Sequence, residues 1–161
     1  MFASKIRTAV AVAVVAVTAM SFGASAAPAD AALSLSPKLT ITKNQTSYST
    51  VEVTGLVKGT PAELQNVVAK DYRIVWRLWG DDTFSDDFIH GPDPASLQMT
   101  SKGLEFKGLA VMKTSKLNED WGVDEIYAGV RLVTTTSYIN GKITHGPTIV
   151  GKESNQIWRS F

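Results

Sequence analysis

The stretch YRIVWRLW, residues 72–79, alternates between apolar and basic or mixed positions along its length. Ile74, Trp76 and Leu78 share one side of an extended chain, whereas Arg73 and Arg77 share the other. Because successive side chains of a strand point to opposite faces, a period of two predicts a strand with one face on the core. We therefore expect Trp76 to be a core residue and the two arginines to lie outside.

Runs with the same period lie on both sides of this strand. Val51, Val53 and Val57 alternate with polar residues within 49–57, and 125–133 (EIYAGVRLV) repeats the pattern with Ile126 first. Such runs are typical of half-buried strands. Shorter runs of the same kind predict strands at 37–43, 104–111, 148–150 and 156–158.

Two of the expected segments carry turn signals. Asn140-Gly141 lies at the centre of 137–144 and predicts a hairpin, because a type I′ turn needs positive φ at both central residues. In 104–111 the apolar phase slips at Lys107-Gly108, which favours a bulge or tight turn there.

One helix is expected, near residues 61–70. Thr60 is followed by Pro61 and, three residues after the cap, by Glu63, which is a capping box with proline at the first helical position. Seven to nine short strands with a single short helix predict an all-β fold, most simply an antiparallel β-sandwich. A small closed barrel is the alternative.

The first thirty residues have the order of a secretory signal peptide. Lys5 and Arg7 precede an uncharged Ala- and Val-rich segment, and small residues follow it. We predict a leader over 1–26, with cleavage after residue 26 or 31, and a single β-sandwich domain over 32–161. A retained membrane anchor is the other interpretation of the segment. The expected location is secreted or extracellular, by bacterial export, with no membrane span after processing.

The composition excludes several classes of protein. The chain has 161 residues and no cysteine, which rules out a disulfide scaffold, a thiolate metal site and a cysteine nucleophile. Its 16 basic and 15 acidic residues are nearly balanced, and the leader takes two of the bases. Because a nucleic-acid binder needs a basic surplus, we expect no nucleic-acid partner. Without disulfides, the domain depends on core packing, or on packing with a bound metal.

The acidic residues are concentrated in two short stretches. One follows the strand 72–79 and the other precedes the strand 125–133. If these strands are antiparallel, both stretches lie at the same end of the domain. Calcium takes six to eight oxygen ligands from carboxylates, amides and carbonyls of loops, so we consider a calcium site there. The candidate ligands are Asp81, Asp82, Asp86, Asp87, Asn118, Asp120, Asp124 and Glu125.

The arrangement resembles in outline the calcium-dependent C2-type sandwiches, in which aspartates on loops at one end hold the ion. This resemblance is architectural and implies the same sandwich and the same ion. Neither stretch is an EF-hand, because Asp86 stands where that loop needs glycine and Pro92 where it needs glutamate. The alternative is that these residues only form turns and keep the loops soluble.

Trp79 and Trp121 border the acidic stretches and are the candidate platform for a ligand such as a sugar. The same carboxylates offer a second interpretation, because a glycosidase needs a pair of them across a cleft. His90 and His145, the only histidines, both begin a His-Gly-Pro tripeptide, which is first of all turn chemistry. No G-x-S-x-G elbow occurs, so a serine triad is not expected.

We therefore predict a secreted binding or interaction module with an acidic loop end, with calcium as a possible ligand and an extracellular protein or glycan as partner. No catalytic residue and no cofactor other than calcium is assigned. The first alternative is a small extracellular hydrolase that uses a carboxylate pair from the acidic loops. The second is a structural cell-envelope protein without a ligand.

Overall fold

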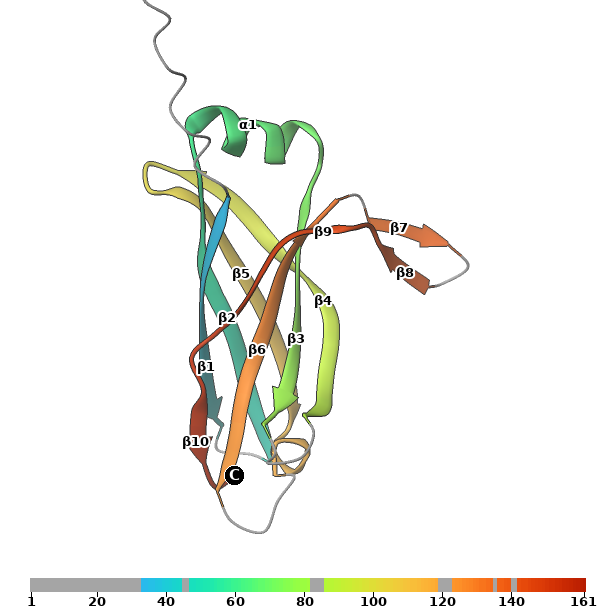
Figure 1. Cartoon of the computed structure of the whole chain (residues 1–161). Coiled ribbons are helices and arrows are strands. Elements are labelled where there is room, and N and C mark those ends of the chain that lie inside the picture. Colours follow the sequence, from blue (N-terminus) through green and yellow to red (C-terminus); the bar gives the residue numbers. More distant parts are fainter. Residues whose placement is uncertain (1–32, 45–46, 82–85, 119–122, 135, 140–141) are drawn as a thin grey trace, which may run out of the picture.

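The computed structural model describes residues 33–44, 47–81, 86–118, 123–134, 136–139 and 142–161. Strands dominate this part of the chain, and Figure 1 shows them as a long curled sheet with one helix at its end. In chain order the elements are β1 (Ser34–Lys43), β2 (Tyr48–Lys58), α1 (Pro61–Ala69), β3 (Arg73–Gly80), β4 (Asp87–Thr100), β5 (Gly103–Lys113), the 3-10 turn η1 (Thr114–Lys116), β6 (Asp124–Val133), β7 (Thr136–Ile139), β8 (Lys142–His145), β9 (Thr148–Glu153) and β10 (Ile157–Arg159).

The main sheet is antiparallel throughout, in the order β1-β2-β5-β4-β3-β6-β10, and β9 also pairs with β6. β4 turns the corner of the sheet, because residues 87–95 pair with β3 and residues 96–100 pair with β5. The predicted all-β fold with one short helix is confirmed. Eight of the described strands form one curled sheet, a half-barrel, which does not divide clearly into the two layers of the predicted sandwich, and β7 and β8 form a separate two-stranded sheet.

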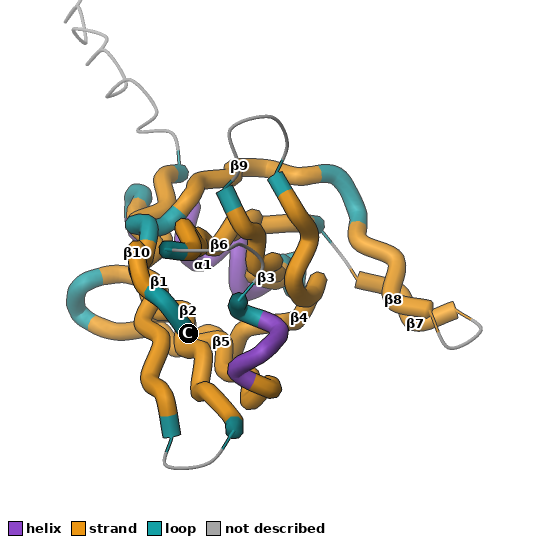
Figure 2. The backbone as a smooth tube through the Cα atoms, turned by 90° about the horizontal axis from the view of Figure 1, so that it is seen from below, coloured by secondary structure: helices purple, strands orange, loops and turns teal. Residues whose placement is uncertain are grey.

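The first strand, β1, forms one edge of the curled sheet, and it is hydrogen-bonded to the segment between β9 and β10 at the other edge. The amide of Leu39 donates a 2.9 Å hydrogen bond to Oδ1 of Asn155, and Nδ2 of Asn155 donates to the Leu39 carbonyl at 3.3 Å. Asn155 lies between β9 and β10, so its side-chain amide pairs with β1 as a neighbouring peptide group would. This contact joins the first strand to the last part of the sheet, as the view from below in Figure 2 shows for β1 and β10.

The core fills the inside of the curl. Trp76 of β3 is fully buried there, as expected, together with residues of β1, β2, β5 and β6. A Cβ atom on Gly108 of β5 would lie 2.3 Å from Nε1 of Trp76. The indole therefore occupies the space that a side chain at position 108 would need.

This packing corrects the bulge predicted at Lys107-Gly108. β5 is one continuous strand whose pairing with β2 has no register shift. Gly108 takes an inward position, and Leu109 and Val111 point outward, where they are 56% and 62% exposed. The apolar alternation of β5 only appears to slip, because the inward residue Gly108 is small and the outward residues Leu109 and Val111 are apolar.

The helix closes one end of the curl, and Leu64 and Val67 reach the core from it. Its capping box is confirmed, since the Thr60 hydroxyl accepts from the Glu63 amide and the Glu63 carboxylate accepts from the Thr60 amide. The expected hairpin at 137–144 is confirmed as β7 and β8, paired from Ile139 and Lys142 outward. It projects from the side of the sheet (Figures 1 and 2).

The predicted leader, 1–26, lies outside the described residues. Among the residues that the structure describes, no helix is both long enough and apolar enough to cross a bilayer. Strand β4 was not expected from the sequence, which favoured a loop over the acidic segment that contains Gly91, Pro92 and Pro94.

Candidate ligand-binding groove

The outward face of β6 and β3 carries a groove. Alternation along β6 sends Ile126, Ala128 and Val130 inward, so residues 127, 129 and 131 point outward. On β3, Arg77 and Trp79 are the outward residues that lie beside this part of β6. The register pairs Trp79 with Tyr127 and Arg77 with Gly129. Two residues from each strand thus form one continuous patch.

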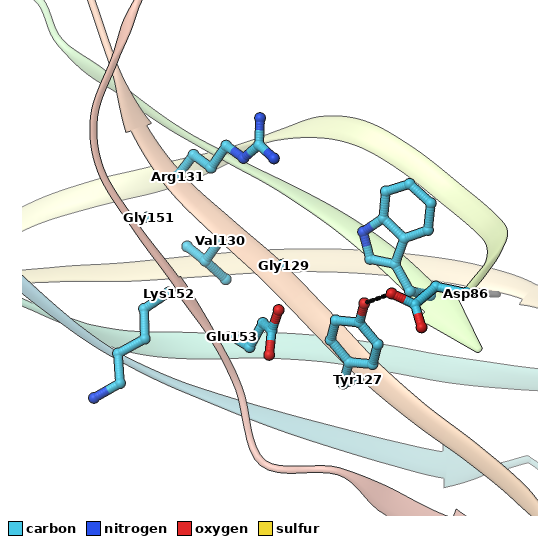
Figure 3. A pocket seen from close by; sticks show the side chains of 9 residues that line it. Asp86, Tyr127, Gly129, Val130, Arg131, Gly151, Lys152 and Glu153 are labelled. Atoms are coloured by element: carbon cyan, nitrogen blue, oxygen red, sulfur yellow. Dashed lines mark hydrogen bonds between the residues drawn. The ribbon is translucent and has the colours of Figure 1, made fainter. Parts of the chain in front are cut away.

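β9 and the residues just before β4 complete the walls of this groove. The space is about 570 Å³, and Figure 3 shows it in close view. Gly129 of β6 and Gly151 of β9 leave part of the floor without side chains, and charged side chains surround it. The lining residues are Trp79, Asp86, Tyr127, Gly129, Val130, Arg131, Gly151, Lys152 and Glu153.

Gly129 makes room for the indole of Trp79. A Cβ atom at position 129 would lie 3.3 Å from Nε1 and 3.6 Å from Cδ1 of Trp79, so the ring rests against the bare backbone of β6. Phe88 of β4 meets Trp79 edge-on, with ring centroids 5.5 Å apart and planes at 72°. Phe88 is 54% exposed and Trp79 is half-buried, so the two rings form an aromatic surface that is partly open to solvent, with Trp79 in the groove and Phe88 beside it.

Tyr127 and Asp86 join the two sides of the groove. The phenol hydroxyl donates a 2.7 Å hydrogen bond to Oδ2 of Asp86. Burial is the main cause that raises the pKa of Tyr127, and the hydrogen bond to Asp86 adds to it. The negative charges of Asp86, Glu153 and Asp81 raise this pKa further. The hydroxyl is therefore held as a neutral donor beside acidic groups.

The acidic end of the groove continues into a smaller hollow of about 290 Å³, lined by Asp81, Asp86, Tyr127, Glu153, Ser154 and Gln156. The carboxylate of Asp81 accepts a hydrogen bond from the side-chain amide of Gln156. The backbone amide of Asp81 donates to the carbonyl of Glu125 at 2.7 Å. Arg131, four residues after Tyr127 on β6, lies toward the opposite end of the groove (Figure 3). The groove is thus polarised along its length.

The structure brings the two predicted acidic stretches to the same end of the sheet, because β3 and β6 are antiparallel and Asp81 bonds to Glu125. Asp86 lines the groove, Asp87 is exposed at the start of β4, and Asn118 is exposed after η1. Asp124 is buried, with 3% exposed. Asp82, Asp120 and Trp121 lie outside the described residues.

The calcium prediction is not supported by a ligand set within the described residues. Among them, no group of three or more His, Asp or Glu side chains is placed to hold a metal ion. His90 is instead paired with Asp93, its Nε2 lying 2.7 Å from Oδ2. A calcium site at this end would depend on residues 82–85 and 119–122, which the structure does not describe.

The sequence identified Trp79 and Asp86 and predicted a strand at 148–150, but it did not show that this strand extends to Glu153 or that it lies beside the groove. Gly151, Lys152 and Glu153 reach the groove only because β9 pairs with β6, from Gly129 with Glu153 to Val133 with Thr148. The outward positions of β6 were available in the sequence, as the odd residues of the run 125–133. They became a site only once the register placed them beside Trp79 and Glu153. No known protein family, curated protein or solved structure matches the chain.

Proposed function

We propose that the protein is an exported binding module that holds a segment of a glycan chain in the groove of β3, β6 and β9. The observation that carries this proposal is the open aromatic pair of Trp79 and Phe88 beside the hydrogen-bonded Tyr127 and Asp86. A sugar ring has an apolar C–H face and a rim of hydroxyls. An aromatic surface next to fixed polar groups matches both parts.

The acceptors and donors of the groove suit hydroxyl groups. Asp86, Glu153 and Asp81 offer carboxylate oxygens to hydroxyl protons, and the amide of Gln156 lies at the same end. Carboxylates form stronger hydrogen bonds than neutral acceptors do, so a few well-placed ones suffice for orientation. The groove and the smaller hollow are continuous, since both are lined by Asp86, Tyr127 and Glu153, so we expect a ligand of more than one sugar ring.

A peptide ligand is less compatible with the backbone. Peptides that bind by strand addition need an unpaired strand edge. β6, which forms the floor, is hydrogen-bonded on one side to β3 and on the other to β9 and β10. The floor strand therefore offers no free edge for strand addition, and recognition over it depends on side chains.

The test is binding of soluble neutral and acidic oligosaccharides, measured by isothermal titration calorimetry. Removing an aromatic platform with Trp79→Ala should weaken binding about tenfold or more. Trp158→Ala is the matched control, because Trp158 is 62% exposed on β10 and does not line the groove. It should stay within about twofold of the parent protein.

Each alternative predicts a different result in this experiment. Release of shorter sugars during the titration would favour the extracellular hydrolase, with Asp86 and Glu153 as its first candidates for a carboxylate pair. Binding that Trp79→Ala leaves unchanged would place the ligand elsewhere and contradict the proposal. The structural envelope protein predicts no binding to any sugar in the panel.

A further inference from the structure

A second, more enclosed hollow adjoins the basic end of the groove. It measures about 210 Å³ and shares Trp79, Gly129 and Arg131 with the groove. Arg77 of β3, His145 at the end of β8 and Thr148 at the start of β9 also line it. We call this hollow the Arg77–Arg131 pocket. Two arginines and a histidine line it, and none of its lining residues in the described part of the chain is acidic.

The two arginines lie side by side. Arg77 is paired in register with Gly129, two residues before Arg131 on the neighbouring strand. Both point to the outer face, so they are diagonal neighbours on one side of the sheet. Like charges in this relation repel each other, and a partly enclosed site increases the repulsion. A negative charge bound beside them would reduce this repulsion.

No side chain within the described part of the chain supplies that charge. Neither Arg77 nor Arg131 forms an ion pair among the described residues. Arg73 provides the contrast, because it points to the same face of β3 and is held by Asp71 at 2.6 Å. Of the two arginines on this face of β3, only Arg73 has an acidic partner among the described residues, and Arg77, like Arg131 on β6, is left available.

His145 gives an independent indication. Both of its ring nitrogens are buried from solvent and have no hydrogen-bond partner among the described residues. Buried polar atoms are rarely left unsatisfied, so each such group calls for an explanation. Burial lowers the pKa of His145, and the positive charge of the nearby Arg77 lowers it further. An acceptor between them would satisfy both groups.

We infer that the Arg77–Arg131 pocket binds an oxyanion, a carboxylate, sulfate or phosphate group, carried by the glycan in the adjoining groove. Arginine offers a planar fork of N–H donors that matches such groups bidentately. The imidazole N–H of His145 and the Thr148 hydroxyl line the same pocket and can donate further hydrogen bonds. This inference rests on the proposed function for the source of the oxyanion, and it makes the expected glycan an acidic one.

The test compares three probes by calorimetry at low salt: tri-galacturonate, its uncharged methyl ester, and inorganic phosphate. We expect tri-galacturonate to bind about tenfold or more tightly than the ester, because the ester cannot pair with the guanidinium groups. Arg131→Gln and Arg77→Gln should each remove most of this preference. Arg73→Gln is the matched control and should retain it, since Arg73 lies outside the pocket. A sulfated trisaccharide distinguishes a sulfate-bearing from a carboxylate-bearing ligand.

The outcomes separate this inference from the proposed function. Equal affinity for tri-galacturonate and its ester, lost in Trp79→Ala, would overturn the oxyanion pocket and leave the glycan groove standing. Arg131-dependent binding of phosphate with no binding of any sugar would support the pocket and contradict the glycan proposal. Binding of none of the probes, or a preference unchanged in both arginine variants, would overturn the inference. Thermal unfolding of each variant verifies that it is folded.

Discussion

The hydroxyl of Tyr127 lies 2.7 Å from Oδ2 of Asp86, so a residue of β6 is tied to the segment that enters β4. This bond orders the acidic end of the groove, because Asp86 belongs to the groove wall and Tyr127 to its floor. It also places a neutral phenol among three carboxylates whose charges favour its protonated form. Two consequences can be measured, one in stability and one in titration.

Tyr127→Phe should lower the free energy of unfolding by about 1 kcal/mol, the usual contribution of one such hydrogen bond. The pKa of Tyr127 is raised in the folded protein, so the folded state keeps the proton that the unfolded chain releases above about pH 10. Stability therefore falls as pH rises above 10, and the variant should lose this part of the decline.

In an alkaline titration followed at 295 nm, the variant should lack the last phenolate to form. Tyr48→Phe, at a residue that is 43% exposed, should keep it.

The strands with a regular alternation were predictable from sequence. β3 and β6 each bury every second residue, and the helix is marked by Thr60, Pro61 and Glu63 before its first turn. In these segments the local pattern and the packing agree, so no long-range information is needed. The same holds for the hairpin of β7 and β8, in which the expected Asn-Gly pair lies between the two strands.

β4 was not predictable, because its sequence contains the features that normally end strands. Gly91, Pro92 and Pro94 lie within it, and its pairing with β3 shifts register between Trp76 and Leu78 and again before Trp79. Irregular pairing of this kind accommodates residues that cannot donate a ladder hydrogen bond. The groove was missed for a related reason. Glu153 and Asp86 line the same groove because of the way the strands pair, and a single sequence does not specify that pairing.

Gly108→Ala tests why the apolar phase of β5 appears to slip. The new methyl group would lie 2.3 Å from Nε1 of the buried Trp76, so we expect a loss of about 1–3 kcal/mol in the free energy of unfolding from overpacking. Trp76→Phe shortens the opposing ring. Combined with Gly108→Ala, it should cost less than the sum of the two single changes, because the pair is in contact. Urea unfolding measures all three variants.

Gly151→Ala is the control for this cycle. Its Cβ would lie 3.4 Å from Cγ of Arg131, a flexible side chain that can move, so the change should stay within about 0.5 kcal/mol. If Gly108→Ala proves equally harmless, or if its cost adds fully to that of Trp76→Phe, the contact between position 108 and the indole does not explain the sequence.

His145 predicts a pH dependence of stability in the acid range. Its folded-state pKa lies below the ordinary value of 6.5, mainly through burial, with Arg77 as the second cause. Arg131 lines the same pocket, and among the described residues no acidic side chain does so. As pH falls below 6.5, the unfolded chain takes up a proton that the folded state resists, so stability decreases until the pH passes the folded pKa.

His145→Gln should remove this part of the decline in urea unfolding measured between pH 7.5 and pH 5. Thr144→Val, at the exposed neighbouring position of β8, should keep the slope of the parent protein. A slope that His145→Gln leaves unchanged would show that the imidazole is not held in the desolvated position that the structure gives it.

Asn155→Ala tests the junction between the two edges of the sheet. The change removes the acceptor of the Leu39 amide and the donor to the Leu39 carbonyl, both on a residue whose side chain is in the core. Leaving such groups without partners costs about 1–3 kcal/mol, so we expect a loss of stability in that range. The amide of Leu39 should also exchange with solvent faster, because opening of the junction exposes it.

Asn155→Asp keeps an acceptor for the amide but places a carboxylate against the Leu39 carbonyl, so it should be no more stable than the alanine variant. Ser36→Ala, which removes a long 3.5 Å bond on the exposed side of β1, should change neither the stability nor the Leu39 exchange rate. An unchanged exchange rate in Asn155→Ala would mean that packing between β1 and the last strands holds the edges together without this side chain.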